Sequence, residues 1–95
     1  MLMDTTVTEN VGMHRFELEI SPDAIAAAYY RDEGGRVALI HTEVPSEYAG
    51  HGIATKLAAG TFELIRRSGR RAVIRCPFMN AFYANHPEYS DVVDG

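Results

Sequence analysis

Hydrophobic and polar residues follow the two-residue repeat of β-strands in several parts of the chain. Residues 14–20 alternate between apolar and polar side chains, which predicts a half-buried strand. Residues 24–31 contain successive alanines that would suit a helix, but two tyrosines followed by an Asp-Glu-Gly-Gly loop favour a strand entering a hairpin. The apolar run that opens residues 37–44 predicts a central strand covered on both faces. Residues 71–76 predict a further strand.

The helical repeat occurs twice. Between residues 53 and 68 apolar side chains recur every three or four positions, and Gly69 supplies a C-terminal stop. Residues 78–85 predict a shorter helix, and residues 89–93 a last extended piece. The side chains of the short helix that we expect to point inward are Phe78, Ala81 and Phe82.

The order of these elements predicts one α+β domain over residues 1–95, with residues 1–10 as a flexible arm. Short turns join the first three strands, which should therefore run antiparallel. The strand–helix–strand unit that follows implies a parallel, right-handed crossover. We therefore expect a mixed, mostly antiparallel sheet packed against one long helix and one short C-terminal helix.

Composition restricts the class of protein without identifying a function. The 95 residues are 46% hydrophobic and 23% charged, as in globular domains rather than disordered chains. No apolar run approaches the roughly 18 residues of a membrane-spanning helix, and the N-terminal residues lack the basic-then-apolar order of a secretion signal. Cys76 is the single cysteine, which excludes an intrachain disulfide framework. We expect a cytoplasmic protein that is a monomer or a weak homodimer.

The formal net charge of −4 argues against general nucleic-acid binding, but the charge is unevenly distributed. Residues 47–76 contain six basic and two acidic residues, so this segment carries +4 and the rest of the chain −8. One interpretation is a solvated helix end whose dipole favours cations. The other is a site for a phosphorylated ligand on the basic side, with a cationic substrate drawn to the acidic side.

A glycine-containing turn joins the strand that ends near residue 44 to the long helix. The first N–H groups of a helix lack internal partners and the helix dipole adds partial positive charge, so a phosphate group is stabilised there. Gly50 and Gly52 allow unusual dihedral angles and close approach of a ligand. The alternative is a plain strand-to-helix turn. The order of Thr55 and Lys56 does not fit a P-loop, and the third glycine of a dinucleotide-binding fingerprint is absent.

Residues 41–45, 50–54, 76–78 and 86–89 read His-Thr-Glu-Val-Pro, Gly-His-Gly-Ile-Ala, Cys-Pro-Phe and His-Pro-Glu-Tyr. Together these segments resemble the GCN5-related N-acetyltransferases (GNAT), and more closely a subfamily of minimal, single-domain GNAT-like proteins that bind acetyl-CoA. The resemblance implies the GNAT fold, in which the central parallel strands splay apart. The pyrophosphate motif of the family, Arg/Gln-x-x-Gly-x-Gly/Ala, falls on the glycine turn, with Ala49 where Arg or Gln is usual.

The resemblance implies acetyl-CoA as co-substrate. The pyrophosphate would bind the backbone amides of the turn, and the pantetheine arm would run along the strand beside Glu43. A second segment, within residues 80–83, would line the other side of the ligand. The arginine-rich segment or Lys56 would contact the ribose phosphate. The cofactor-binding residues so implied are Thr42, Val44, Gly50, His51, Gly52, Ile53, Ala54, Thr55, Asn80, Phe82 and Tyr83.

Acetyl transfer to an amine requires a base for the amine proton and donors that stabilise the carbonyl oxygen. His41 and Glu43 lie two apart on one strand, so both point to one face and suit an acid/base pair. Alternatively, His41 is a hydrogen-bonded core histidine and Glu43 a rim residue. A backbone N–H near Val44 could polarise the carbonyl. In many GNAT enzymes a tyrosine protonates the departing thiolate, a role that falls on Tyr83 here unless its ring only packs.

Cys76 is the other candidate catalytic residue. It ends a strand next to Arg75, and a neighbouring cation favours the reactive thiolate. The thiol could carry a transient acetyl group or contact the thioester, or it could be a buried and inert side chain. The histidines and Cys76 share no metal-type spacing, so we expect no metal site.

The sequence therefore predicts an acetyl-CoA-dependent N-acetyltransferase whose acceptor is an amine, with a lysine of a basic peptide or protein as one candidate. The principal alternative is a non-catalytic module that holds acetyl-CoA or CoA as a sensor or carrier. A third class is a scaffold domain that binds another protein through its short C-terminal helix. We expect neither a nucleic-acid nor a membrane partner.

Overall fold

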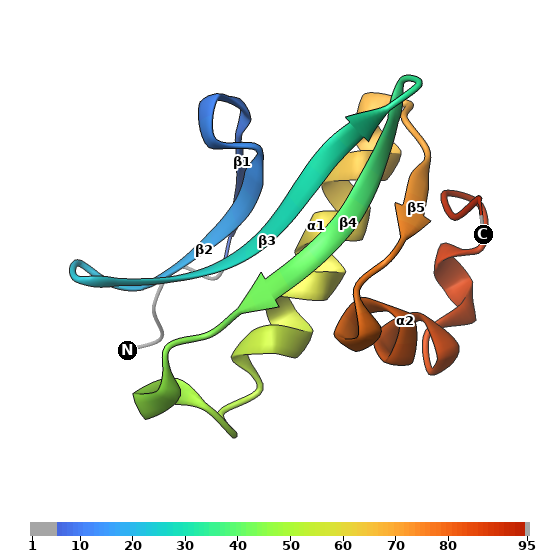
Figure 1. Cartoon of the computed structure of the whole chain (residues 1–95). Coiled ribbons are helices and arrows are strands. Elements are labelled where there is room, and N and C mark those ends of the chain that lie inside the picture. The colour runs from blue at the N-terminus through green and yellow to red at the C-terminus, as the bar shows by residue number, and fades with distance from the viewer. Residues whose placement is uncertain (1–5, 95) are drawn as a thin grey trace.

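A computed structural model describes residues 6–94, which form one mixed sheet of five strands. In chain order the strands are β1 (Val7–Asn10), β2 (Arg15–Ser21), β3 (Ala24–Glu33), β4 (Arg36–Glu43) and β5 (Ala72–Ile74). They lie in the sheet in this same order; β1 to β4 are antiparallel neighbours, and β5 runs parallel to β4 (Figure 1). The predicted α+β fold class is confirmed, including the parallel crossover through the long helix.

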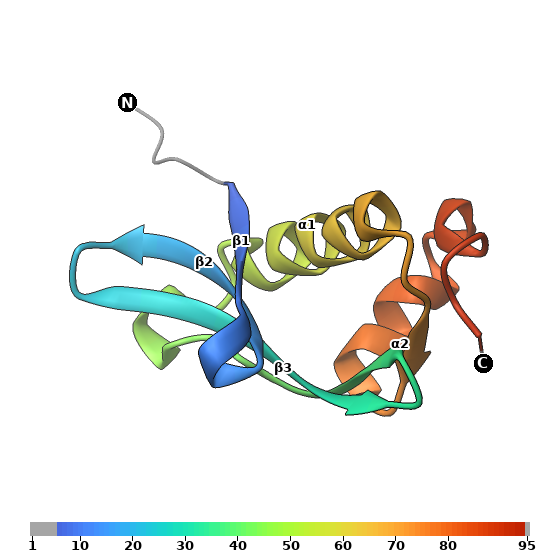
Figure 2. The same ribbon diagram turned by 90° about the horizontal axis from the view of Figure 1, so that it is seen from above.

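Two helices pack on the same face of the sheet. α1 spans Ile53–Ser68 as predicted, and α2 spans Pro77–Ala84, beginning just before the predicted position. The ring of Phe62 in α1 stacks on that of Phe82 in α2, with centroids 5.9 Å apart and planes 8° apart. Among the described residues no helix covers the opposite face of β1 to β4 (Figures 1 and 2). Short 3₁₀ turns occur at Val11–Met13, Ser46–Tyr48 and Pro87–Tyr89.

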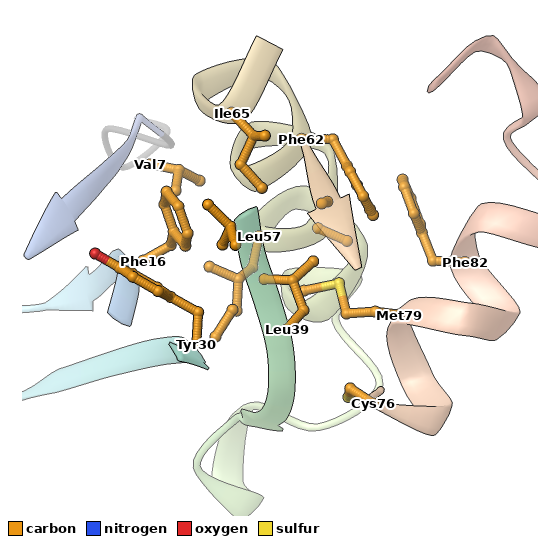
Figure 3. Close-up of a cluster of buried hydrophobic side chains, with 14 of the residues drawn as sticks. Val7, Phe16, Tyr30, Leu39, Leu57, Phe62, Ile65, Cys76, Met79 and Phe82 are labelled. Atoms are coloured by element: carbon orange, nitrogen blue, oxygen red, sulfur yellow. The ribbon is translucent and has the colours of Figure 1, made fainter. Parts of the chain in front are cut away.

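The hydrophobic core lies between the sheet and the two helices (Figure 3). On α2 the inward side chains are Met79 and Phe82, whereas Ala81 is exposed, so the predicted inward position of Ala81 is wrong. Residues three apart share one face of a helix, while a residue two positions along points away from it. The largest fully buried side chains include Phe16, Leu18, Val37, Leu39, Leu57, Phe62, Ile65 and Met79.

The predicted flexible arm is wrong for residues 7–10, because they form the edge strand β1 and pair with β2. Residues 1–5 lie outside the described part of the chain. Val7 approaches α1 so closely that a Cβ atom on Gly60 would lie 2.3 Å from its Cγ2. Glu9 accepts two hydrogen bonds from Arg70, at 2.7 and 3.0 Å. This polar strand is therefore held by partners that only the folded chain supplies.

The C-terminal segment follows the outer edge of β5. Val93 forms an isolated parallel bridge with Ala72. The N–H of Ala72 donates to Val92 O at 2.7 Å, and its carbonyl accepts from Asp94 N at 2.8 Å. Because the 3₁₀ turn ends at Tyr89, the predicted extended piece is confirmed only at its C-terminal end.

The two central strands pair only where they begin. Residues 37–39 of β4 pair with residues 72–74 of β5, and Arg75 N–H donates to Leu39 O at 2.8 Å. Ile40 is then an extra residue in the pairing with β3, a β-bulge, and the rest of β4 pairs with β3 alone. Because a bulge bends its strand, β4 diverges from β5 at this point. The expected splay of the central strands is thereby confirmed.

Candidate functional site

The turn between β4 and α1 contains two glycines with left-handed backbone angles. Gly50 has a φ of 83°, and Gly52, which caps α1, has a φ of 75°. Other residues rarely adopt such angles, so the path of the chain into α1 depends on both glycines. An ideal Cβ atom on either glycine would meet nothing within 4 Å. The turn is therefore open in front of both residues.

Every backbone N–H from Gly50 to Thr55 lacks an acceptor among residues 6–94. No side chain caps α1, and its first turn holds no acidic residue. The N–H of Lys56 donates to Gly52 O at 3.1 Å, and the helical ladder starts there. Such a run of unpaired donors, reinforced by the helix dipole, suits an anion. The free amides agree with the sequence expectation, while their binding of a pyrophosphate stays a prediction.

Two surface pockets meet at Thr55. The first, of about 280 Å³, lies in front of the glycine turn, and its lining is Val44, Tyr48, Ala49, Gly50, Gly52, Ile53, Ala54 and Thr55. The second, of about 200 Å³, lies between the start of α1 and α2, and its lining is Thr55, Phe78, Ala81, Phe82, Asn85 and His86. Thr55 is the residue that the two linings have in common.

The second pocket includes residues that the sequence did not assign to the site. Phe78, Ala81 and Asn85 follow the three- and four-residue spacing of one helix face, which is the signal that could have found them. Of the predicted second segment, Phe82 lines the pocket, with the ring of His86 stacked on it at 4.2 Å. The exposed Asn80 and the half-buried Tyr83 line neither of these pockets.

Cys76 lies where the central strands have separated, at the start of α2 (Figure 3). Its side chain is 4% exposed, and its Sγ is 3.4 Å from the hydroxyl oxygen of Thr42 across the gap. The predicted cation beside the thiol is wrong, because Arg75 donates to both carboxylate oxygens of Glu33, at 2.6 and 3.2 Å. Successive residues of an extended chain point to opposite sides, so Arg75 turns away from the thiol.

His41 and Glu43 form a pair on the face of the sheet turned away from the helices. Nε2 of His41 is 3.1 Å from Oε2 of Glu43, and the two side chains are 58% and 62% exposed. Because Ile40 is an extra residue, His41 pairs with Tyr29 instead of continuing the buried face of Leu39. The interpretation of His41 as a core histidine is therefore wrong, and the predicted pairing with Glu43 is present.

The two groups of candidate catalytic residues thus lie on opposite faces of β4. Thr42 turns toward Cys76, whereas its neighbours His41 and Glu43 face outward. Beyond Leu39, alternate residues of β4 also direct their N–H and C=O groups toward the gap, where no described strand pairs with them.

The predicted cationic patch is wrong in large part, because internal ion pairs neutralise most of its arginines. In each of four arginine–carboxylate ion pairs, a hydrogen bond from the guanidinium group lowers the pKa of the partner carboxyl group. Within residues 6–94 Lys56 and Arg67 make no ion pair and remain available to a ligand. The pairs, with N···O distances of 2.6 or 2.7 Å, are Arg66–Asp91, Arg70–Glu9, Arg71–Asp94 and Arg75–Glu33.

Within residues 6–94 no three His, Cys, Asp or Glu side chains gather closely enough to hold a metal ion. None of the described helices is both long and apolar enough to cross a membrane.

Comparison with known proteins adds independent information to this geometry. A family model described as GCN5-related N-acetyl-transferase matches residues 15–92. Protein NATD1 of Bos taurus is 35% identical over 63 residues, which cover 65% of this chain and 56% of the bovine protein. The match thus spans little more than half the length of this curated relative.

Proposed function

The chain belongs to the GCN5-related N-acetyltransferase family, and on that premise we propose that it binds acetyl-CoA and transfers the acetyl group to an amine. The observation that carries the proposal is the run of unpaired N–H groups from Gly50 to Thr55, which faces an open pocket of about 280 Å³. A diphosphate linker supplies the acceptors that such a run requires.

Main-chain donors hold the pyrophosphate in this proposal. Ala49 stands where the family motif usually has Arg or Gln, so its side chain contributes no hydrogen bond. Lys56, which has no carboxylate partner within residues 6–94, is the candidate cation for a phosphate oxygen. The arginine cluster is not part of the ligand site, because its members bind carboxylates of this chain.

The pantetheine arm runs into the gap between β4 and β5. There the unpaired backbone groups beyond Leu39 bind its amides as a neighbouring strand would. This path brings the thioester toward Thr42 and Cys76, which meet across the gap at 3.4 Å. A backbone N–H near Val44 then stabilises the carbonyl oxygen as it gains charge.

Transfer proceeds by attack of the amine nitrogen on the thioester carbonyl carbon. The C–N bond forms, the C–S bond breaks, and the CoA thiolate takes up a proton. His41, bonded to Glu43, is the proposed base for the amine proton. In a two-step route Sγ of Cys76 attacks the thioester carbon and the CoA thiolate leaves; the amine then attacks the acetyl-cysteine carbon and the Cys76 thiolate leaves. Tyr83 as the acid for the thiolate stays a prediction.

A sensor or carrier that holds acetyl-CoA without transfer is the second candidate. It is favoured by the burial of Cys76, whose side chain is 4% exposed, and by the engagement of Arg75 with Glu33. A thiol without a neighbouring cation is a weaker nucleophile at neutral pH.

Three measurements on one preparation separate these functions. Calorimetry with acetyl-CoA measures binding, intact-protein mass after incubation detects an acetyl group on Cys76, and a panel of amines detects transfer. Saturable heat together with an acetylated amine is the expected result. Saturable heat with no product from any amine favours the sensor, and absence of saturable heat overturns both candidates.

A further inference from the structure

The lining of the pocket in front of the glycine turn has two parts with different chemistry. One part is the run of unpaired N–H groups that begins at Gly50. The other comes from the 3₁₀ turn Ser46–Tyr48, which lies between β4 and α1 (Figure 1). Most of the lining residues have aliphatic side chains or none, so these supply no hydrogen bonds. Among the described residues that line this pocket, Tyr48 and Thr55 alone carry a polar side-chain group.

The 3₁₀ turn holds Tyr48 in a fixed position. The N–H of Tyr48 donates to Pro45 O at 2.9 Å, and the N–H of Ala49 donates to Ser46 O at 3.1 Å. Ser46 and Glu47 are exposed, whereas the Tyr48 side chain is half-buried and packs against the hydrophobic core. Because the backbone bonds and the packing already restrict the ring, a ligand that contacts it loses little affinity to the ordering of this side chain.

The hydroxyl group is the part of Tyr48 that remains available to a ligand. It has no hydrogen-bond partner within residues 6–94, and unlike the buried hydroxyl of Thr61 it is reached by solvent. A phenolic hydroxyl donates one hydrogen bond, and the oxygens of a phosphate group accept such bonds. The ring of Tyr48 is therefore held by the protein, while its polar end is free to bind an anion.

An anion in this pocket depends on uncharged donors. No residue in the lining carries a charged side chain, and Glu47, the exposed neighbour of Tyr48, is not part of the lining. Ala49, at the first position of the glycine motif, has no side-chain donor either. In a pocket of about 280 Å³, a phosphate group that reaches the amides of the turn also comes close to the remaining lining residues. The Tyr48 hydroxyl thus adds a side-chain donor to the backbone donors of the same small space.

From this accessibility, packing and chemistry, we propose that the hydroxyl of Tyr48 donates a hydrogen bond to a phosphate oxygen of the ligand, in addition to the bonds from the backbone amides. The inference rests on the proposed function, because it takes a diphosphate group as the occupant of the pocket. Tyr48 is then a ligand-binding residue that the sequence did not assign to the site, and its donor lies one residue before Ala49.

The test removes the hydroxyl and keeps the ring. Tyr48→Phe should weaken acetyl-CoA binding about tenfold in calorimetry, because a hydrogen bond to a charged group is lost. ADP, which carries the diphosphate without the thioester arm, should lose affinity by the same factor, and pantetheine should lose none. The control is Tyr29→Phe, which removes the same hydroxyl from a residue that lines neither pocket of the site. Its affinity for each ligand should equal that of wild type.

Ionic strength provides a second readout for the same variant. A hydrogen bond from an uncharged hydroxyl acts at contact distance, whereas salt screens the attraction between exposed charges. The ratio of wild-type to Tyr48→Phe affinity should therefore be the same at low and at high salt. The matching ratio for Lys56→Ala, which removes a charge, should approach one in high salt.

Three results would overturn the inference about Tyr48. Unchanged affinity in Tyr48→Phe would remove the hydrogen bond, and a loss that appears only in Tyr48→Leu would leave the ring a packing role alone. An equal loss of affinity for pantetheine would show that the substitution distorts the pocket as a whole.

The same ligands separate this inference from the proposed function. ADP binding is followed by the NMR signals of the backbone amides from Gly50 to Thr55. If these signals shift with ADP in wild type and the affinity falls in Tyr48→Phe, but acetyl-CoA gives no saturable heat, the hydrogen bond stands and the proposed function fails. If acetyl-CoA binds wild type and Tyr48→Phe equally well, the proposed function stands and the hydrogen bond fails. Absence of binding by both ligands would overturn both proposals.

Discussion

The two ends of α1 differ in how their backbone N–H and C=O groups are hydrogen-bonded. At the N-terminal end the amides from Gly50 to Thr55 have no acceptors within residues 6–94, and no side chain caps the helix. At the C-terminal end Gly69 N–H donates to Arg66 O at 3.1 Å, and the hydroxyl of Ser68 donates to Ile65 O at 2.8 Å. Hydrogen bonds therefore cap the C-terminal end of the helix at Ile65 and Arg66, whereas the N-terminal end has no such cap within residues 6–94.

The arginines near the C-terminal end fasten distant parts of the chain. Arg66 bonds to both carboxylate oxygens of Asp91 and lies 5.1 Å from the centroid of the Tyr89 ring. Arg71 holds Asp94, and Arg70 holds Glu9 of β1. The comparison teaches that one end of the helix presents unpaired amides to solvent, whereas the other stabilises both ends of the described chain.

The sharpest test of this difference exchanges one glycine at each end. Gly52→Val should weaken acetyl-CoA binding at least tenfold, about 1.4 kcal/mol, because its side chain occupies the space in front of the amides. Gly69→Val is the control, since the two φ angles are 75° and 76° and neither Cβ would meet an atom within 4 Å. Both variants should lose about 1–2 kcal/mol of stability in urea unfolding, but only Gly52→Val should lose affinity in calorimetry.

Equal affinity losses in the two glycine variants would show that general strain, and not the ligand site, is responsible. Unchanged affinity in both would remove the pyrophosphate from the turn altogether.

Glu9→Gln should weaken the contact between β1 and Arg70 near the C-terminal end of α1. The expected loss is about 1–2 kcal/mol in the free energy of unfolding at neutral pH. The bonds from Arg70 lower the pKa of Glu9 below 4.5, so its contribution is present above that pH and is lost as the pH falls through the lowered value. The difference between variant and wild type should therefore shrink below pH 4.5 in urea titrations. Glu47→Gln, an exposed residue near the other end, is the control. A constant difference at every pH would contradict the ion pair.

Thr61 lies between the two ends and provides a smaller test. Its side chain is fully buried, and its hydroxyl oxygen has no hydrogen-bond partner among residues 6–94. Replacement by the isosteric valine should raise the free energy of unfolding by about 1 kcal/mol, measured by urea unfolding, without changing acetyl-CoA affinity. A destabilised Thr61→Val variant would indicate a partner for the hydroxyl that this structure lacks.

The smallest effect is expected at Lys56. Lys56→Ala should reduce acetyl-CoA affinity about two- to threefold at low ionic strength, and the reduction should disappear in high salt. Arg67→Ala, near the other end of α1, removes the same charge and should leave the affinity unchanged in calorimetry. If the two variants lose the same acetyl-CoA affinity, long-range charge rather than a local contact explains the effect.

Elements with a strong local pattern were predictable from the sequence. The bounds of α1 agree with its periodicity and with Gly69, and the free amides at its start follow from the absence of a capping side chain. β1 was missed because Glu9 and Asn10 are polar; Glu9 is bound by Arg70, 61 residues along the chain, and Asn10 by Glu17 of the neighbouring strand β2.

In the candidate site, the orientation of His41 and the ion pairs of the arginines could not be predicted from local sequence patterns. Strict alternation from the buried Leu39 would direct His41 into the core, and the extra residue Ile40 turns it outward instead. No residue type announces such a bulge, since it arises from the pairing with β3. The neutralised arginines were missed for a related reason: Glu9 and Asp94 are brought to them by the fold and not by sequence proximity.

The contact between Gly60 and Val7 has a practical consequence for shortened versions of this protein. Deleting the first ten residues would look harmless from their composition. It would, however, remove β1 and with it the Val7 side chain that packs against the backbone of α1 at Gly60. Without it the long helix could slide on the sheet and misalign the amides at its start. An N-terminal truncation would therefore impair ligand binding from across the molecule, although it touches no residue of the pocket.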